Sequence, residues 1–208
     1  MMTLPTIPSD PDLLRSMMAG DEDAFTMLYR RRQGAVYRFA LQMSGSPEIA
    51  EDVTQEVFIV LIREAQRYDP NRGSLAAYLY GIARNHVLRK LDEDRLFVPL
   101  AVPDEDAGAT VHASLVAEGD PLGDLARNEM VEALRNSILA LPAHYREVVV
   151  LCDLHEMSYI EASGVIGCAV GTVRSRLHRA RALLIEKLRS NKKAPAPPEV
   201  LKSTRCFA

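Results

Sequence analysis

Residues 158–181 read SYIEASGVIGCAVGTVRSRLHRAR, and this stretch determines how the carboxy-terminal part of the chain folds. Ser158 and Glu161 have the spacing of a capping box, in which each side chain pairs with a backbone N–H at the start of a helix. Gly167 supplies the left-handed backbone that ends a helix in a sharp turn. Helical spacing of apolar residues resumes at Val170. The stretch therefore predicts a helix-turn-helix.

The second predicted helix has one apolar face and one basic face. Its apolar residues recur at steps of three or four and so share a buried side. Residues 170–193 hold eight basic side chains against one acidic side chain. Such a helix, held at an angle by a short turn, suits insertion into the DNA major groove. A solvated cationic helix on an ordinary bundle is the alternative. The apolar positions are Val170, Val173, Leu177, Ala180 and Leu184.

The whole chain has the composition of a soluble globular protein. It holds 208 residues, of which 48% are hydrophobic and 25% are charged. No apolar run approaches the roughly 18 residues that span a bilayer, and the amino terminus lacks the pattern of a signal peptide. The cysteines Cys152, Cys168 and Cys206 lie too far apart for a disulfide framework. We therefore expect a cytoplasmic protein with reduced thiols and no membrane insertion.

Charge is distributed unevenly along the chain. The net charge is −3, yet residues 91–128 hold nine acidic side chains against two basic ones. This stretch, interrupted by glycine and proline, has the composition of a flexible linker. No segment shows a β pattern, so the predicted fold class is all-α, with two small helical domains joined by a flexible acidic linker. The predicted divisions are a flexible arm at 1–20, a first domain at 21–91, the linker at 92–124, a second domain at 125–193 and a disordered tail at 194–208.

Three helices are predicted in the first domain. Apolar residues near helical spacing indicate the first at residues 21–43. Ser46 and Pro47 suit the N-cap and the first position of the second helix, which has an apolar side and an acidic side. That helix ends before a turn-rich loop at residues 68–73, and Ser74 then caps the third. In the second domain, further helices are predicted near residues 125–140 and 143–154.

Four segments, in the right order, resemble the sigma factors of bacterial RNA polymerase. The segments AEDVTQEVF (50–58) and YDPNRGSLAAYLYGIARN (68–85) are similar to sigma region two. The segments LPAHYREVVVL (141–151) and GTVRSRLHRAR (171–181) are similar to sigma region four. Two such domains with no region three between them is the layout of the extracytoplasmic-function, or group four, sigma factors. The chain resembles that family over about residues 21–188, apart from the linker.

The resemblance implies a docking site for the polymerase. In the family, a helix with the pattern D-x-x-Q-E-x-F docks on the clamp helices of the largest subunit of core RNA polymerase. Exposed carboxylates beside an aromatic residue would give this surface an apolar anchor and a charged rim. Without the resemblance, a solvated acidic face is the simpler interpretation. The core polymerase contacts implied are Asp52, Gln55, Glu56 and Phe58.

The resemblance also implies opening of the promoter at its minus-10 element. The family captures an unstacked base at a loop that corresponds to residues 68–73. Aromatic, amide and basic side chains suit an unstacked base and its phosphates, whereas a turn selected only for proline and glycine is the alternative. Tyr78 stands where the family usually has tryptophan, and tyrosine can still fill the core or stack. The single-stranded minus-10 contacts implied are Tyr68, Asn71, Arg72, Tyr78, Arg84 and Asn85.

The helix-turn-helix corresponds to the family's reader of the double-stranded minus-35 element. Arg174 and Arg176 are two residues apart and so point to different sides of the helix. We assign base reading to Arg174, which lies nearer the helix amino terminus, and phosphate binding to Arg176. Cys152 stands where the family commonly has a phosphate-binding arginine, so that contact is expected to be absent. The minus-35 contacts implied are Arg174, Ser175, Arg176, His178, Arg179, Arg181 and Tyr159.

These observations predict an alternative sigma factor that performs no chemistry and uses no cofactor or metal. Its implied partners are core RNA polymerase, promoter DNA and an anti-sigma factor, in a stress or envelope response. One rival is a free-standing helix-turn-helix regulator that binds DNA without polymerase. Another is a metal or thiol enzyme, because Cys152, His155 and Cys168 are close in sequence. A structural zinc site needs a further ligand, and the obvious addition, His178, lies on the expected DNA face.

Overall fold

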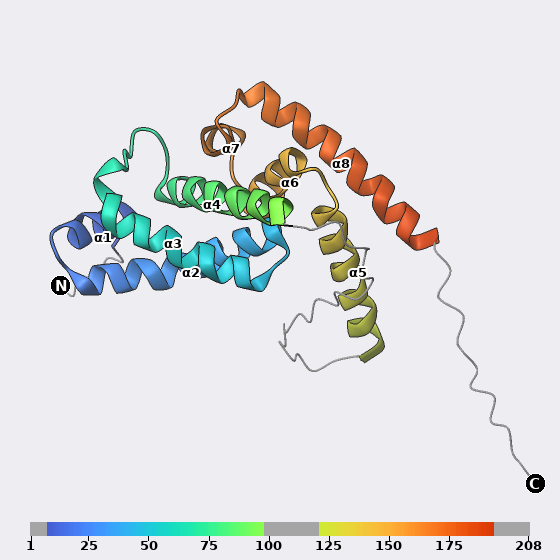
Figure 1. Ribbon diagram of the computed structural model, residues 1–208, viewed down its shortest axis with the longest axis horizontal. Helices are drawn as coiled ribbons and strands as arrows, with labels where there is room; N and C mark the ends of the chain where they lie inside the picture. Colours follow the sequence, from blue (N-terminus) through green and yellow to red (C-terminus); the bar gives the residue numbers. More distant parts are fainter. Residues whose placement is uncertain (1–7, 98–120, 194–208) are drawn as a thin grey trace, which may run out of the picture.

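The computed structural model describes residues 8–97 and 121–193, here called the amino-terminal half and the carboxy-terminal half. No strand occurs among these residues, and the all-α fold class is confirmed. Figure 1 shows α7 beside α4, and α8 running along the outer side of α6 and α7. The helices are α1 (Asp10–Met18), α2 (Glu22–Ser44), α3 (Pro47–Glu64), α4 (Leu75–Phe97), α5 (Pro121–Leu139), α6 (Ala143–Val149), α7 (Tyr159–Ile166) and α8 (Val170–Lys193), with short turns η1 (Ala65–Arg67) and η2 (Val150–Leu154).

Helix α1 replaces most of the flexible arm that the sequence predicted at residues 1–20, so that prediction is wrong from Asp10 onward. A capping box of Ser9 and Asp12 starts the helix. Asp10 is buried and accepts hydrogen bonds from Arg31, at 2.8 Å, and from Arg32. A buried carboxylate needs such partners, and here they come from α2. The helix is therefore ordered by contacts that its own sequence does not contain.

The amino-terminal half is a bundle in which α2, α3 and α4 pack on one another. Ser46 caps α3 by accepting a hydrogen bond from the Ile49 N–H at 3.2 Å, as predicted. Ser74 caps α4 by accepting one from the Ala77 N–H at 3.2 Å. Helix α4 continues to Phe97, and α5 begins at Pro121, so both helices extend into the predicted linker at 92–124. The rest of that linker and the tail at 194–208 lie outside the described residues.

The predicted helix-turn-helix is confirmed in the carboxy-terminal half. Ser158 and Glu161 form the capping box of α7, and Gly167 ends this helix with a φ of 75°. Before it, α6 ends at Val149 and continues as the π-helical turn η2, where a single helix over 143–154 was expected. The apolar stripe of α8 is buried as predicted, with Val170 half-exposed at its start. The buried members are Val173, Leu177, Ala180 and Leu184.

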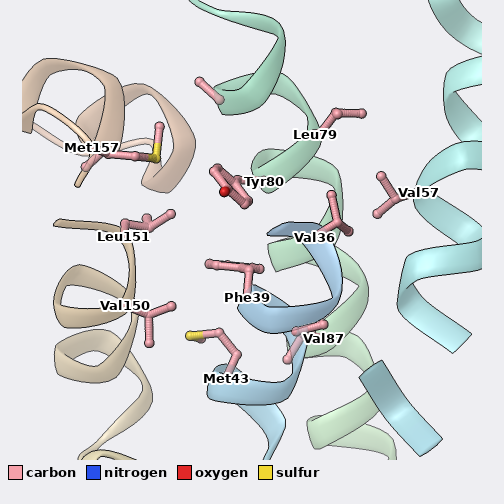
Figure 2. Packing of buried hydrophobic residues seen from close by; sticks show 14 of the residues in the cluster. Val36, Phe39, Met43, Val57, Leu79, Tyr80, Val87, Val150, Leu151 and Met157 are labelled. Atoms are coloured by element: carbon pink, nitrogen blue, oxygen red, sulfur yellow. The ribbon is translucent and has the colours of Figure 1, made fainter. Parts of the chain in front are cut away.

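The two halves share one hydrophobic core. Figure 2 shows Phe39 and Tyr80, from α2 and α4, facing Leu151 and Met157 of the carboxy-terminal half. The rings of Phe39 and Tyr80 lie 5.2 Å apart between their centroids. The sequence predicted two domains on a flexible linker and gave no sign of this contact. Burial of apolar surface is the physical reason for it, because each half presents large side chains to the other.

The end of α2 fits closely against the junction of α5 and α6. Gly45 has a φ of 79°, and a Cβ atom at this position would lie 3.0 Å from the Cδ1 atom of Leu139. The Arg146 guanidinium donates hydrogen bonds to the carbonyls of Met43, Leu139 and Leu141. A cation near the carboxyl ends of two helices is favoured by their dipoles. Arg146 of the carboxy-terminal half thus joins the end of α2 to the junction of α5 and α6.

Candidate nucleic-acid and polymerase interfaces

The outer face of α8 presents most of the predicted minus-35 residues. Arg174, Ser175, His178 and Arg179 are all exposed, while the buried stripe lies beneath them. The Ser175 hydroxyl donates to the Thr172 carbonyl at 3.0 Å, so it is partly engaged by its own helix. The exposed set is basic and lies on the second helix of a helix-turn-helix, the element that enters the major groove in this motif.

Arg174 lies above the ring of Tyr159, with its Cζ atom 5.7 Å from the ring centroid. A guanidinium at this distance is attracted to the negative face of the aromatic ring. Tyr159 begins α7 and is about one-third exposed, at 36%. The first helix of the motif thus positions the side chain to which the sequence assigned base reading.

Arg176 and Arg181 are instead held by acidic residues of the same half. Arg176 Nη1 donates to Glu147 Oε1 at 3.2 Å. Arg181 donates through Nε and Nη2 to the two carboxylate oxygens of Asp153, at 3.1 and 2.5 Å. These hydrogen bonds to the Asp153 carboxylate raise the pKa of Arg181. Both arginines were predicted DNA contacts, and the structure gives each an ion pair within the protein.

The predicted minus-10 loop is ordered by its own side chains. The rings of Tyr68 and Tyr78 lie 5.6 Å apart, and the Tyr68 hydroxyl donates to the Gly73 carbonyl at 3.2 Å. Burial raises the pKa of both hydroxyls, so they remain protonated donors. Asn71 donates through its backbone N–H and its side-chain amide to Asp69 Oδ1, at 2.9 and 3.0 Å. Arg72 is exposed at the tip.

Arg84 and Asn85 are neighbours on α4 but face different surroundings. Asn85 is exposed. Arg84 has a side chain only 19% exposed, and its Nε donates to Glu147 Oε2 at 2.7 Å. Glu147 belongs to α6, so this predicted minus-10 contact is turned toward the other half of the chain.

The predicted polymerase contacts on α3 need one correction. Asp52, Gln55 and Glu56 are exposed, but Phe58 is only 3% exposed. Its ring centroid lies 4.7 Å from that of Tyr29, inside the bundle. The assignment of Phe58 as an exposed apolar anchor is therefore wrong, because its position on the helix turns it into the core.

The apolar surface expected of Phe58 is provided by Ile59 and by Ile62, which the sequence placed on the apolar side of this helix. Ile59 and Ile62 are 36% and 56% exposed. They follow Asp52, Gln55 and Glu56 at helical spacing, so these five residues share one face of α3, here called the docking face. Periodicity could have indicated them, but the apolar residues of α3 cover too wide an arc to show which are buried. At one edge of the docking face, the Lys90 ammonium donates a hydrogen bond to Asp52 Oδ2 at 3.0 Å.

An open groove between α2 and α3 adjoins the docking face and was also missed from the sequence. It combines aromatic rings, an arginine and amide side chains. Gln55 belongs both to this groove and to the docking face, so the two surfaces are continuous. The groove is lined by Tyr29, Arg30, Gln33, Gly34, Tyr37, Glu51, Thr54 and Gln55.

The histidine of the predicted metal or thiol rival is held by hydrogen bonds, and Cys152 and Cys168 are free cysteines. His155 Nδ1 lies 2.8 Å from the Tyr80 hydroxyl, and its Nε2 lies 2.9 Å from Gln42 Oε1. Burial, with the charge of Arg38, lowers the pKa of His155 to about 4, so the ring is neutral at neutral pH. Within the described ranges, no group of three or more potential metal ligands is found. The helices of those ranges include none long and apolar enough to cross a membrane.

Comparison with known proteins identifies the family of each half of the chain. The family described as Sigma-70 region 2 matches residues 28–96, and Sigma-70, region 4 matches residues 131–184. Regions two and four in this order define a sigma factor. The ECF RNA polymerase sigma factor SigW of Bacillus subtilis (strain 168) is 31% identical over 179 residues, which is 85% of this chain and 95% of SigW. The chain belongs to the ECF RNA polymerase sigma factors.

Two solved structures have a similar fold. CnrH, in complex with the cytosolic domain of CnrY, matches with a TM-score of 0.64 and 26% identity, over 88% of this chain and 98% of CnrH. The sigma factor RpoE from Bartonella quintana, in complex with the anti-sigma factor NepR, matches with a TM-score of 0.60 and 25% identity, over 79% of this chain and 96% of RpoE.

Proposed function

We propose that this alternative sigma factor binds core RNA polymerase through the docking face and directs it to promoters through α8 and the loop at 68–73. The observation that carries the proposal is the exposed basic face of α8, in a helix-turn-helix belonging to the same chain as a region-two bundle. The protein acts by binding and performs no chemistry. An anti-sigma factor is proposed to control it, since the similar RpoE structure holds one.

Dependence on the polymerase is the direct test of this function. Each half can reach only a few base pairs, so the protein alone should bind duplex promoter weakly. Core polymerase fixes both halves on one DNA molecule and raises their effective concentration. The affinity of the protein for a randomised duplex library, measured with and without core polymerase, shows how far DNA binding depends on the polymerase. Equal affinity in both conditions would favour a free-standing regulator.

Ile62→Asp should weaken binding to core polymerase by about tenfold or more, equivalent to at least ~1.4 kcal/mol. Ile62 is 56% exposed, and a carboxylate there would have to be desolvated at the apolar end of the docking face. Because the side chain is already exposed, the free energy of unfolding should change little. Titration of labelled protein with core polymerase measures the affinity.

Ile160→Asp is the matched control for this experiment. Ile160 is 74% exposed and lies on α7, away from the docking face. The Ile160→Asp substitution also replaces an exposed isoleucine by a carboxylate, so it introduces the same charge as Ile62→Asp. Equal loss of core binding in the two variants would contradict the assignment of α3 as the docking element.

Arg174→Ala should lower promoter affinity by about 1 to 3 kcal/mol and relax the preference at one minus-35 position. The reason is its exposed position near the start of α8, above Tyr159. Arg176→Ala should behave differently, because removing Arg176 deprives the buried Glu147 of a partner and so destabilises the carboxy-terminal half.

Holoenzyme binding to a series of promoter variants separates these outcomes, with urea unfolding of each protein as the second measurement. Arg189→Ala serves as a control, since it removes an exposed positive charge far along the same helix. If Arg174→Ala lowers affinity uniformly at every position, as Arg189→Ala is expected to do, the base-reading role is wrong.

A further inference from the structure

We propose that Asp153 is a positioning residue of the helix-turn-helix, which holds Arg181 ready for a DNA phosphate and so fixes how α8 lies in the major groove. This inference deepens the proposed function and rests on it, because Arg181 is assigned to the minus-35 element. Asp153 lies in η2 and Arg181 lies on α8, so both belong to the carboxy-terminal half. Their ion pair is therefore a feature of that half alone.

The Asp153 carboxylate holds one edge of the Arg181 guanidinium. Nε donates to Oδ2 at 3.1 Å, and Nη2 donates to Oδ1 at 2.5 Å. Two parallel hydrogen bonds of this kind fix the orientation of the planar group as well as its distance. The outer edge of the guanidinium, formed by Nη1 and the second N–H of Nη2, takes no part in this ion pair. That edge is left for another ligand.

The ion pair is open to solvent on the side of the arginine. The side chain of Arg181 is 52% exposed, whereas that of Asp153 is 27% exposed. A guanidinium edge with two N–H groups matches two oxygens of a phosphate. A flexible side chain loses conformational entropy when a ligand immobilises it, and an arginine that is already held loses less. Asp153 thus prepares Arg181 for a phosphate contact.

Arg176 is also ion-paired, but its geometry is different. Its Nη1, which belongs to the outer edge of the guanidinium, donates to Glu147 Oε1 at 3.2 Å. The side chain of Glu147 is only 3% exposed, and that of Arg176 is 30% exposed. This ion pair therefore directs the end of Arg176 toward the protein interior. Of the two ion-paired arginines, the geometry favours Arg181 as a DNA contact.

Arg181 and Arg174 lie on the same side of α8. They are seven residues apart, which is close to two turns at about 3.6 residues per turn. Tyr159 of α7 lies beside both, because its ring lies 5.7 Å from Arg174 Cζ, and it adds to the effect of Asp153 in raising the pKa of Arg181. Phosphate contacts position a protein on DNA, and base contacts specify the sequence. A phosphate bound by Arg181 would thus set the register in which Arg174 meets the bases.

Asp153→Asn in the full-length protein, bound to core polymerase, tests this role. Asparagine has one acceptor oxygen in place of two, so it cannot accept both hydrogen bonds. Two DNA probes are compared: the duplex that the wild-type holoenzyme enriches from a randomised library, and a mixed-sequence duplex of the same length. The ratio of the two affinities should fall by about two- to tenfold, the cost of immobilising one flexible side chain. Affinity for the mixed-sequence duplex should not fall, because it depends mainly on charge.

Glu186→Gln is the matched control for the change in charge. Glu186 is an exposed carboxylate on the same helix, and its removal leaves Arg181 paired with Asp153. This variant should change both affinities by the same factor and so leave their ratio unchanged. Arg181→Lys keeps the positive charge but lacks the planar fork that binds a carboxylate and a phosphate at once. Its ratio should therefore fall as in Asp153→Asn.

Circular dichroism checks that helicity is unchanged in each variant. If Asp153→Asn loses helicity, the ratio measured for Arg181→Lys decides the question. The proposal is overturned if the affinities for the two duplexes change by the same factor. An equal loss would mean that the ion pair only stabilises the carboxy-terminal half, and an equal gain would mean that Asp153 only repels DNA.

The same measurements separate this proposal from the proposed function. A wild-type holoenzyme that enriches no sequence from the library would refute the proposed function. If the wild type enriches a sequence and the ratio for Asp153→Asn equals that for Glu186→Gln, only the positioning role of Asp153 is refuted.

Discussion

Leu177→Ala should lower the free energy of unfolding by about 2 to 5 kcal/mol, the range for large-to-small changes in a core. Leu177 is 2% exposed and lies in the buried stripe of α8, which packs on α5, α6 and α7. The lost side chain would leave a cavity beneath the basic face, because close-packed neighbours relax only partly. Promoter binding should then fail through loss of order in the recognition helix. Urea unfolding followed by circular dichroism measures the change.

Ile185→Ala provides the control on the same helix. Ile185 is 52% exposed, so little buried area is lost and the change should remain within about 0.5 kcal/mol. If the two substitutions cost the same, the assignment of α8's buried face is wrong.

Lowering the pH from about 7 to about 5 should reduce the free energy of unfolding by about 2 kcal/mol through His155 alone. Its pKa is depressed from 6.5 to about 4 by burial, with Arg38 adding repulsion. The unfolded chain therefore binds the proton more readily. The stability is fully present above the unfolded value of 6.5 and is lost as the pH falls toward the folded value of about 4. Below that value the loss levels off.

The groups around His155 make the effect specific to the packing of the two halves. Tyr80 on α4 and Gln42 and Arg38 on α2 face the ring from the amino-terminal half. His155→Gln keeps a polar side chain that does not titrate. The difference between wild type and this variant, measured by urea unfolding across that pH range, isolates the contribution of His155 from those of carboxylates. If the difference in the free energy of unfolding between the two proteins does not change with pH, the lowered pKa of His155 is contradicted.

The site could be predicted from the sequence only in part. The exposed residues Arg174, His178 and Arg179 follow from the periodicity of α8, since the buried stripe fixes which face is outward. The same reasoning failed on α3, where apolar residues cover a wide arc. Whether Phe58 or Ile62 faces solvent depends on how α3 is rotated against α2. That rotation is set by packing and is not encoded in the spacing of one helix.

The sequence by itself determined the features that depend on near neighbours. The capping box of Ser158 and Glu161, the glycine turn at Gly167 and the buried stripe of α8 involve residues a few positions apart, so their geometry follows from local spacing. Only the tertiary structure decided the partners of charged and polar groups. Asp10 holds α1 through arginines of α2, and Glu147 meets Arg84 across 63 positions of the chain. Such pairs form because buried charges need partners, and which partner is available is fixed only when distant segments pack together.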